Sequence, residues 1–156
     1  MKFSTSIEYA VHGLMYLAAA PADQPVLIGD VVSATRVPEA YLRKLFQQLV
    51  RSGLVVSQRG PNGGLKLARP PERISLKDVV ESVDGSLPEY TCMKVVRGCD
   101  LAHPCPVHAA FADATRSMKE ILQATTLRSV LDDIAGRDSL VDWLRVTANP
   151  SAASSA

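Results

Sequence analysis

The sequence contains no cysteine in its first 91 residues, and only 5% of its 156 residues are aromatic. It also lacks an apolar run long enough to span a membrane and shows no signal peptide, so we expect a cytoplasmic protein. Neither a C-x-x-C pair nor a nucleophile with a base and an orienting group is recognisable, which argues against a thiol redox enzyme and against catalysis. The odd cysteine count and a length sufficient for a core without crosslinks disfavour a disulfide framework.

All three cysteines lie in one short polar stretch, Cys92 to His108. Six residues separate Cys92 from Cys99, and five separate Cys99 from Cys105. Pro106 suits the first turn of a helix, which places Cys105 at a helix N-terminus, where the dipole favours a thiolate. These wide, uneven gaps are more typical of an iron-sulfur cluster than of zinc, whose usual signature is closely paired cysteines.

An alternative for these cysteines is that they are free thiols, since cysteine often behaves as a small buried hydrophobe. The same loop, however, carries polar side chains at Lys94, Arg97, Asp100 and His103. Their presence argues against burial, so the sequence favours a metal or cluster site.

Charge is distributed unevenly along the chain. Residues 26–73 carry eight Lys or Arg against three acidic residues, whereas residues 74–156 carry eight against eleven. The asymmetry indicates a basic module that faces a polyanion and an acidic module that faces elsewhere.

A helix is predicted from Ser4–Ser6, which suit an N-cap, to the residues before Pro21, because apolar residues recur at helical spacing between them. Glu8 and His12 are four residues apart and therefore neighbours on one side of this helix. Taken alone, they are best interpreted as a surface pair worth about 0.3 kcal/mol.

Two short helices and a hairpin are predicted next. Residues 28–34 form a brief helix, a turn follows at residues 35–37, and Pro38 opens a periodic helix that ends at Gly53. In that helix either Tyr41 or Leu42 points inward, and Gln48 is expected to point outward with the basic residues. Strands at residues 54–58 and 65–68 flank a tip with the sequence RGPNGG, which no Lys-Ser or Lys-Thr follows, so it is not a nucleotide loop.

This order of elements defines a winged helix-turn-helix, in which one helix enters the major groove and the hairpin tip reaches phosphate or the minor groove. We expect double-stranded DNA as the partner. The residues predicted to contact DNA are Glu39, Tyr41, Arg43, Lys44, Gln47 and Arg51 of the second helix and Arg59, Gly60 and Asn62 of the tip.

The second half of the chain is predicted to be helical. Ser75 and Asp78 form a capping box for a helix that ends near Val83. After the cysteine loop a long helix carries an apolar seam, which we interpret as a homodimer contact. The seam consists of Val107, Phe111, Ala114, Met118 and Ile121. A helix capped by Thr126 runs to Gly136, and residues 140–146 form one last turn.

The expected fold is mainly α with a small β-hairpin: a winged helix-turn-helix plus a long dimerisation helix. We divide the chain into a DNA-binding domain at 1–73, a segment at 74–146 with the cluster loop and dimerisation helices, and a disordered tail at 147–156.

Three stretches together resemble the Rrf2 family of bacterial winged-helix regulators over residues 1 to 135. They are MKFSTSIEYAVHGLMYLA, PEAYLRKLFQQLVRSGLVVSQRGPNGGLKLAR and the loop of Cys92, Cys99 and Cys105 followed by Pro106. The resemblance implies a homodimer on a palindromic operator, with the cysteine loop of one protomer near the first helix of the other. Members that sense cluster supply or nitric oxide use the three cysteines and one other ligand.

A redox-sensing member of that family adds a Glu and a His of the first helix, four residues apart, to two cysteines of the partner chain. Glu8 and His12 stand at the matching positions, so the resemblance turns them into expected ligands of a 2Fe-2S cluster. One cysteine is then dispensable, and Cys99 is our choice. The alternative is a 4Fe-4S cluster held by the three cysteines and Glu8.

Two features leave the ligand set open. The first cysteine gap is six residues, whereas the cluster-assembly regulator of the family has five. His108, three residues after Cys105, matches the histidine ligand of that regulator and competes for the same role.

The predicted function is therefore a homodimeric transcription regulator whose operator affinity follows the state of an iron-sulfur cluster. The alternative is a winged-helix DNA-binding protein with structural zinc or no metal that responds to another ligand.

Overall fold

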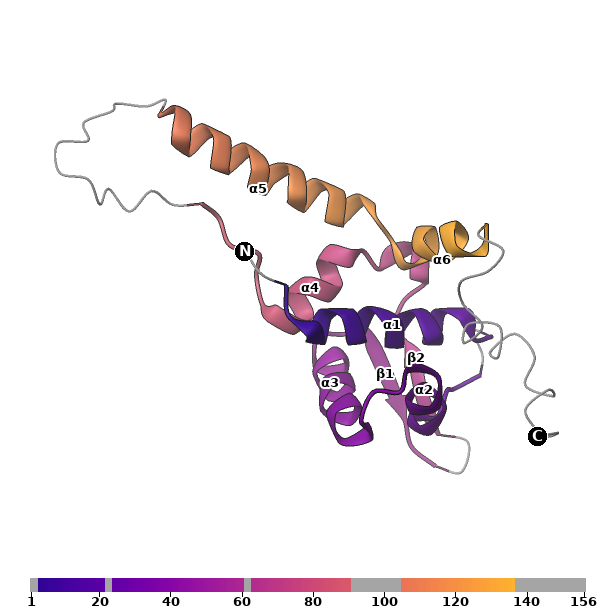
Figure 1. Cartoon of the computed structure of the whole chain (residues 1–156). Helices are drawn as coiled ribbons and strands as arrows, with labels where there is room; N and C mark the ends of the chain where they lie inside the picture. The colour runs from indigo at the N-terminus through magenta and orange to yellow at the C-terminus, as the bar shows by residue number, and fades with distance from the viewer. Residues whose placement is uncertain (1–2, 22–23, 61–62, 91–104, 137–156) are drawn as a thin grey trace.

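The computed structural model describes residues 3–21, 24–60, 63–90 and 105–136 (Figure 1). Within these residues the chain forms the helices α1 (Thr5–Ala19), α2 (Ile28–Thr35), α3 (Glu39–Arg51), α4 (Leu76–Asp84), α5 (Pro106–Ala124) and α6 (Leu127–Ala135), the 3-10 helix η1 (Pro71–Arg73), and the strands β1 (Val55–Gln58) and β2 (Gly64–Leu67). The prediction of a mainly α fold with a small β-hairpin is confirmed.

Helix α1 forms the centre of the molecule. It lies between α2, α3 and the hairpin on one side and α4 and α6 on the other (Figure 1). Its buried residues Ala10, Leu14 and Leu17 join the main core, and the helix ends before Pro21 because proline cannot continue the hydrogen-bond ladder. Ser4 occupies the predicted N-cap position, but its hydroxyl donates to Asp84 instead of capping its own helix.

Helices α2 and α3 form the predicted helix-turn-helix. Arg36 turns the chain between them with φ of +57°, and its N–H donates to the carbonyl of Val32 at 2.8 Å. Gly53, with φ of +73°, follows the end of α3 in a conformation that glycine adopts without strain. Leu42 is fully buried whereas Tyr41 is 39% exposed, which settles that Leu42 is the inward residue.

The wing is a two-stranded antiparallel sheet in which Val55 pairs with Leu67 and Gln58 with Gly64. A single β-bridge joins the wing to the segment before α2. Val26 exchanges two backbone hydrogen bonds with Leu65, at 2.9 and 2.8 Å. This bridge fastens the base of the wing to the segment that leads into α2.

Helices α4 and α6 begin side by side. Ser75 and Thr126 head the two helices, each with a capping box, and they face each other in a β-bridge. Leu127 donates its N–H to the carbonyl of Ile74 at 2.9 Å, and both side chains are fully buried in the main core. The capping box predicted at Ser75 and the cap predicted at Thr126 thus start two helices at one place in the fold.

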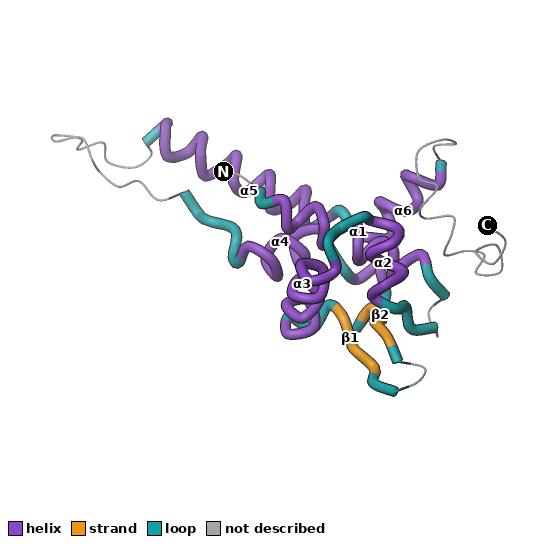
Figure 2. The backbone as a smooth tube through the Cα atoms, turned by 60° about the horizontal axis from the view of Figure 1, so that its bottom comes forward, coloured by secondary structure: helices purple, strands orange, loops and turns teal. Residues whose placement is uncertain are grey.

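Helix α5 projects from the body (Figures 1 and 2) and packs against α4. Met118 packs against a small second core of its own chain made by Ile7, Val80 and Leu87. Met118 was expected in the dimer seam. Its side chain is half-buried against its own chain, and a contact with a second copy stays a prediction. Val107, Phe111 and Ile121 remain 57%, 54% and 65% exposed.

Some predictions are not tested by these residues. The long helix is confirmed as a helix, whereas its role in a dimer stays a prediction, and so does the division into domains at residue 73. The last turn expected at residues 140–146 and the tail at 147–156 lie outside the described residues.

Candidate functional site

The outer face of α3 is polar and basic because its leucines and Phe46 turn inward. Leu42, Leu45, Phe46 and Leu49 are buried. Arg43, Lys44, Gln47 and Arg51 are exposed on the remaining surface of the helix. An amphipathic helix of this kind fixes its orientation by burying one stripe, so its basic face is presented to solvent.

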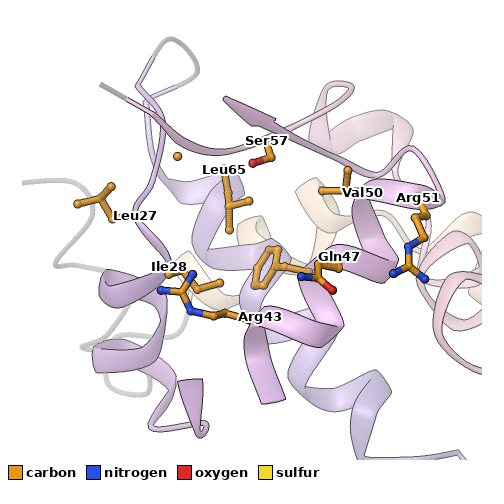
Figure 3. A pocket seen from close by; sticks show the side chains of 10 residues that line it. Leu27, Ile28, Arg43, Gln47, Val50, Arg51, Ser57 and Leu65 are labelled. Atoms are coloured by element: carbon orange, nitrogen blue, oxygen red, sulfur yellow. The ribbon is translucent and has the colours of Figure 1, made fainter. Parts of the chain in front are cut away.

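A groove separates this face of α3 from the wing. Its volume is about 510 Å³, and it is bounded by the start of α2, α3 and both strands. Figure 3 shows Arg43, Gln47 and Arg51 along α3, with Ser57 and Leu65 of the strands opposite them. A basic helix beside a hairpin is the arrangement that the winged helix uses to read a major groove.

Two other predicted contacts of α3 are already engaged within the chain. Glu39 accepts from Nε of Arg43 at 2.8 Å and from a second guanidinium nitrogen of the same residue. The hydroxyl of Tyr41 lies 2.5 Å from Oγ of Ser6, and its ring meets the ring of Tyr9 edge-on at 5.8 Å. Glu39 therefore orients Arg43, and Tyr41 joins α3 to α1.

Gln48 points outward as predicted and is exposed. Its amide nitrogen also donates to the carbonyls of Ser82 and Val83 in α4, a contact that the sequence did not predict. The spacing of α3 leaves Gln48 on the surface, and a neighbouring helix end supplies acceptors that no sequence pattern reveals.

The tip of the wing carries Arg59 and Gly60, both exposed, and Gly60 has φ of +110°. Asn62, also predicted to contact DNA, lies outside the described residues.

Sequence reasoning overlooked Arg36, an exposed cation in the turn of the helix-turn-helix. The signal available for it was a lone arginine between two short predicted helices.

The predicted ligands of helix 1 lie on one side of α1. Glu8 is exposed and His12 is half-buried, and a separation of four residues places their side chains one turn apart. A carboxylate and an imidazole in this arrangement are suitable donors to one iron atom. The donor set on α1 thus fits the group that the sequence resemblance implies.

The described part of the cysteine loop is its end. Cys105 is the N-cap residue of α5 and is half-buried, and Pro106 occupies the first helical position as predicted. His108 lies one turn further on, with its ring 5.5 Å from that of Tyr90, which in turn stacks on Phe111 at 4.7 Å. Cys92 and Cys99 lie outside the described residues.

Cys105 and the donors of α1 are far apart within one chain. Met118, which packs against the second core that contains Ile7 of α1, is thirteen residues after Cys105, and this corresponds to about 20 Å along the axis of α5. Across the described ranges, no three His, Cys, Asp or Glu side chains gather into a metal site. Within the described residues of one chain, Glu8 and His12 therefore do not share a site with Cys105.

The Rrf2 family, described as "Iron-dependent Transcriptional regulator", matches residues 3–133 of this sequence. The chain belongs to the Rrf2 family. It is 36% identical over 145 residues to protein aau3 of Rhizobium meliloti (strain 1021), which covers 92% of this chain and 91% of that protein. It is 30% identical over 142 residues to the HTH-type transcriptional regulator NsrR of Geobacillus kaustophilus (strain HTA426), covering 90% and 97%.

Solved structures agree with the Rrf2 fold. CymR, the global cysteine regulator of B. subtilis, superimposes with a TM-score of 0.72 at 23% identity, covering 85% of this chain and 97% of CymR. IscR of T. potens gives a TM-score of 0.70 at 26% identity, covering 93% of this chain and 96% of that IscR chain.

As an Rrf2 protein the chain is a DNA-binding transcription regulator, and its relatives are regulators rather than enzymes. No helix in the described ranges is long and apolar enough to cross a membrane.

Proposed function

We propose that this Rrf2 regulator binds a palindromic DNA operator as a homodimer and that a bound iron-sulfur cluster controls its operator affinity. The observation that carries the proposal is the placement of the donors. Glu8 and His12 lie on an accessible side of α1, and Cys105 begins a helix that projects about 20 Å away from them. Relatives named NsrR and IscR support a cluster.

The DNA-reading part of the proposal rests on α3 and the wing. Arg43, Lys44, Gln47 and Arg51 face the major groove, and Arg59 with Gly60 and Asn62 reaches the backbone or the minor groove. Two such units related by a dyad read two half-sites, which is why the operator is palindromic.

The proposed ligands come from both chains. Glu8 and His12 of one protomer hold one iron, and two cysteines of the partner's loop hold the other, which favours a 2Fe-2S cluster with Cys99 dispensable. Bound iron would supply sensitivity to oxidation or nitric oxide through its thiolate bonds. The two α1 donors and the loop cysteines then fix how the two wings lie relative to each other, and hence the half-site spacing that the dimer accepts.

The experiment is anaerobic purification followed by three measurements: the visible absorption spectrum, iron and acid-labile sulfide per dimer, and operator affinity with and without the cluster. The operator is obtained by selection from a random duplex library. We expect coloured protein with equal iron and sulfide and a different affinity after cluster removal. A colourless protein whose affinity is the same before and after chelation would overturn the proposal in favour of a regulator with zinc or no metal.

Alanine variants of Glu8, His12, Cys92, Cys99, Cys105 and His108 identify the ligands. We expect iron and sulfide to be lost in Glu8→Ala, His12→Ala, Cys92→Ala and Cys105→Ala and retained in Cys99→Ala. Loss in all three cysteine variants and Glu8→Ala, with His12→Ala intact, indicates a 4Fe-4S cluster instead. If Glu8→Ala and His12→Ala both keep the full content of iron and sulfide, while His108→Ala and every cysteine variant lose it, the ligands do not come from α1.

A further inference from the structure

Three helices meet at the last turn of α4. The amide nitrogen of Gln48, on α3, donates to the carbonyl oxygens of Ser82 and Val83 at 2.9 and 3.0 Å. These carbonyls belong to the last four of α4, which have no partner within their own helix. Gln48 therefore caps the C-terminus of α4 from a different helix.

The next residue ties the same turn to α1. The carboxylate of Asp84 accepts from the backbone N–H of Ser4 at 3.2 Å and from its hydroxyl at 2.6 Å. Residues 82–84 of α4 thus accept hydrogen bonds both from α3 and from the start of α1. Glu8 lies one turn further along α1.

The residues after α4 lead to the cysteine loop, which begins at Cys92. Leu87 is buried in the second core with Ile7 and Val80, and Tyr90 stacks on Phe111 of α5. The segment between α4 and the cysteine loop is therefore packed against α1, α4 and α5.

We propose that Gln48 is a positioning residue that couples the last turn of α4 to α3. Through this coupling, the arm that runs from the end of α4 through the cysteine loop to α5 would influence DNA affinity. The signal that moves the arm rests on the proposed function, whereas the coupling between α4 and α3 does not. The two hydrogen bonds are directional, so they fix the rotation and height of α3 in a way that apolar contacts, which tolerate sliding, do not. Gln47 and Arg51 lie on either side of Gln48 in sequence and line the groove, so any tilt of α3 moves them relative to the bases.

The coupling is tested first without a cluster, by a double-mutant cycle between Gln48→Ala and Asp84→Ala. Both residues are exposed, so neither change opens the core. Operator affinity is measured for four cluster-free proteins. We expect Asp84→Ala to alter affinity about threefold or more in the wild-type background and to have no effect in the Gln48→Ala background. If the fold-change in the double variant equals the product of the two single fold-changes to within about twofold, the residues are not coupled and the proposal is overturned. The same holds if Asp84→Ala has no effect in either background.

The second test compares the cluster-loaded and cluster-free forms. We expect Gln48→Ala to retain iron and sulfide and thermal stability but to bring the ratio of the two operator affinities close to one. Gln48→Lys, which restores a donor, should restore the ratio. Gln123→Ala on α5, which also removes an exposed amide, is the matched control and should leave it unchanged.

The outcomes separate the two proposals. An unchanged ratio in Gln48→Ala, with both affinities lowered equally, shows that Gln48 contacts DNA directly and overturns the coupling. A wild-type protein without a cluster contradicts the proposed function, while the cluster-free cycle still decides whether Gln48 couples α4 to α3.

Discussion

Arg43 and Arg59, both proposed to contact DNA, differ in their surroundings within the chain. The Arg43–Glu39 ion pair is more than half exposed on both sides, and exposed pairs of this kind contribute about 1 kcal/mol or less. A bidentate contact between arginine and guanine discriminates by about 1 to 3 kcal/mol, so a base can displace Glu39 from the guanidinium. In the proposed complex, Glu39 holds Arg43 in position until DNA binds.

Arg59 at the wing tip gives the first prediction. We expect Arg59→Ala to weaken operator binding by about 1 to 3 kcal/mol if the side chain reads a base, or to lower the salt slope by about one if it contacts phosphate. Fluorescence anisotropy over a range of salt concentrations distinguishes the two. Arg73→Ala, which removes an exposed cation from η1, serves as control. Unchanged affinity and slope in Arg59→Ala would remove this residue from the interface.

Asp78 gives a prediction on stability and pH. Burial raises the pKa of its carboxyl, but hydrogen bonds from Ser75 and the charge of Arg69 outweigh burial and lower the pKa below its ordinary value. A lowered pKa in the folded state means that the carboxylate stabilises the fold above the unfolded pKa, near 4, and that this stability disappears as pH falls through the folded value.

We therefore expect Asp78→Ala to lower the free energy of unfolding by about 1 to 2 kcal/mol at neutral pH, through the lost capping box. The difference from wild type should shrink in acid, at about pH 3. Urea unfolding at the two pH values measures it, with Asp133→Ala, an exposed carboxylate of α6, as control. A difference that grows in acid would contradict the assignment.

At the scale of elements, local signals predicted most of the fold. Pro21, Pro38 and Gly53 mark helix ends through backbone chemistry alone, and the glycines of the wing mark its turn. Contacts between distant segments were not predictable. Ser4 has the sequence of an N-cap yet bonds to Asp84, eighty positions away, and periodicity on α5 cannot distinguish a seam that faces its own chain, at Met118, from one that faces outward.

The same limit applies to the candidate site. The composition and spacing of α3 identified its basic face, and Cys105 begins α5 as its neighbouring proline predicts. The roles of Gln48 and Tyr41 depend on which helix ends lie beside α3, and one sequence carries no record of that arrangement.

The crossing of α1 and α3 gives an element-scale prediction. A β-carbon added at Gly13 would lie 3.0 and 3.1 Å from two ring carbons of Phe46, closer than packed carbons normally approach. We expect Gly13→Val to lower the free energy of unfolding by about 1 to 3 kcal/mol and to weaken operator binding because α3 is displaced. Thermal unfolding and anisotropy measure the two effects, with Ala135→Val, at an exposed position of α6, as control. If Gly13→Val has the free energy of unfolding and the operator affinity of wild type, then α1 and α3 move apart without loss of stability, which contradicts the prediction.

At the scale of the whole molecule, assembly is decided by the outward face of α5. Ile121 is 65% exposed on a helix none of whose described residues is buried. In the proposed dimer, Ile121→Asp places an unpaired charge at the contact and should raise the dimer dissociation constant roughly a hundredfold. Met118→Asp, the change that the sequence pattern suggests, would instead disturb the second core.

Sedimentation velocity measures this effect, and Glu120→Ala on the same helix is the matched control. We expect Ile121→Asp to sediment as a monomer and to bind half-sites independently. A variant that remains dimeric and binds its palindrome as wild type does would show that α5 is not the interface.

The bridge between Ser75 and Thr126 makes the arm from α4 through α5 an insertion whose two ends meet at one place on the body. Because the entropy of closing a loop grows slowly with its length, by about 0.6 kcal/mol for each doubling, such an insertion can be lengthened, shortened or exchanged at small thermodynamic cost. A change in the length of the arm that spares the inner face of α4 and the acceptors of Gln48 should therefore leave α3 and its basic face in place.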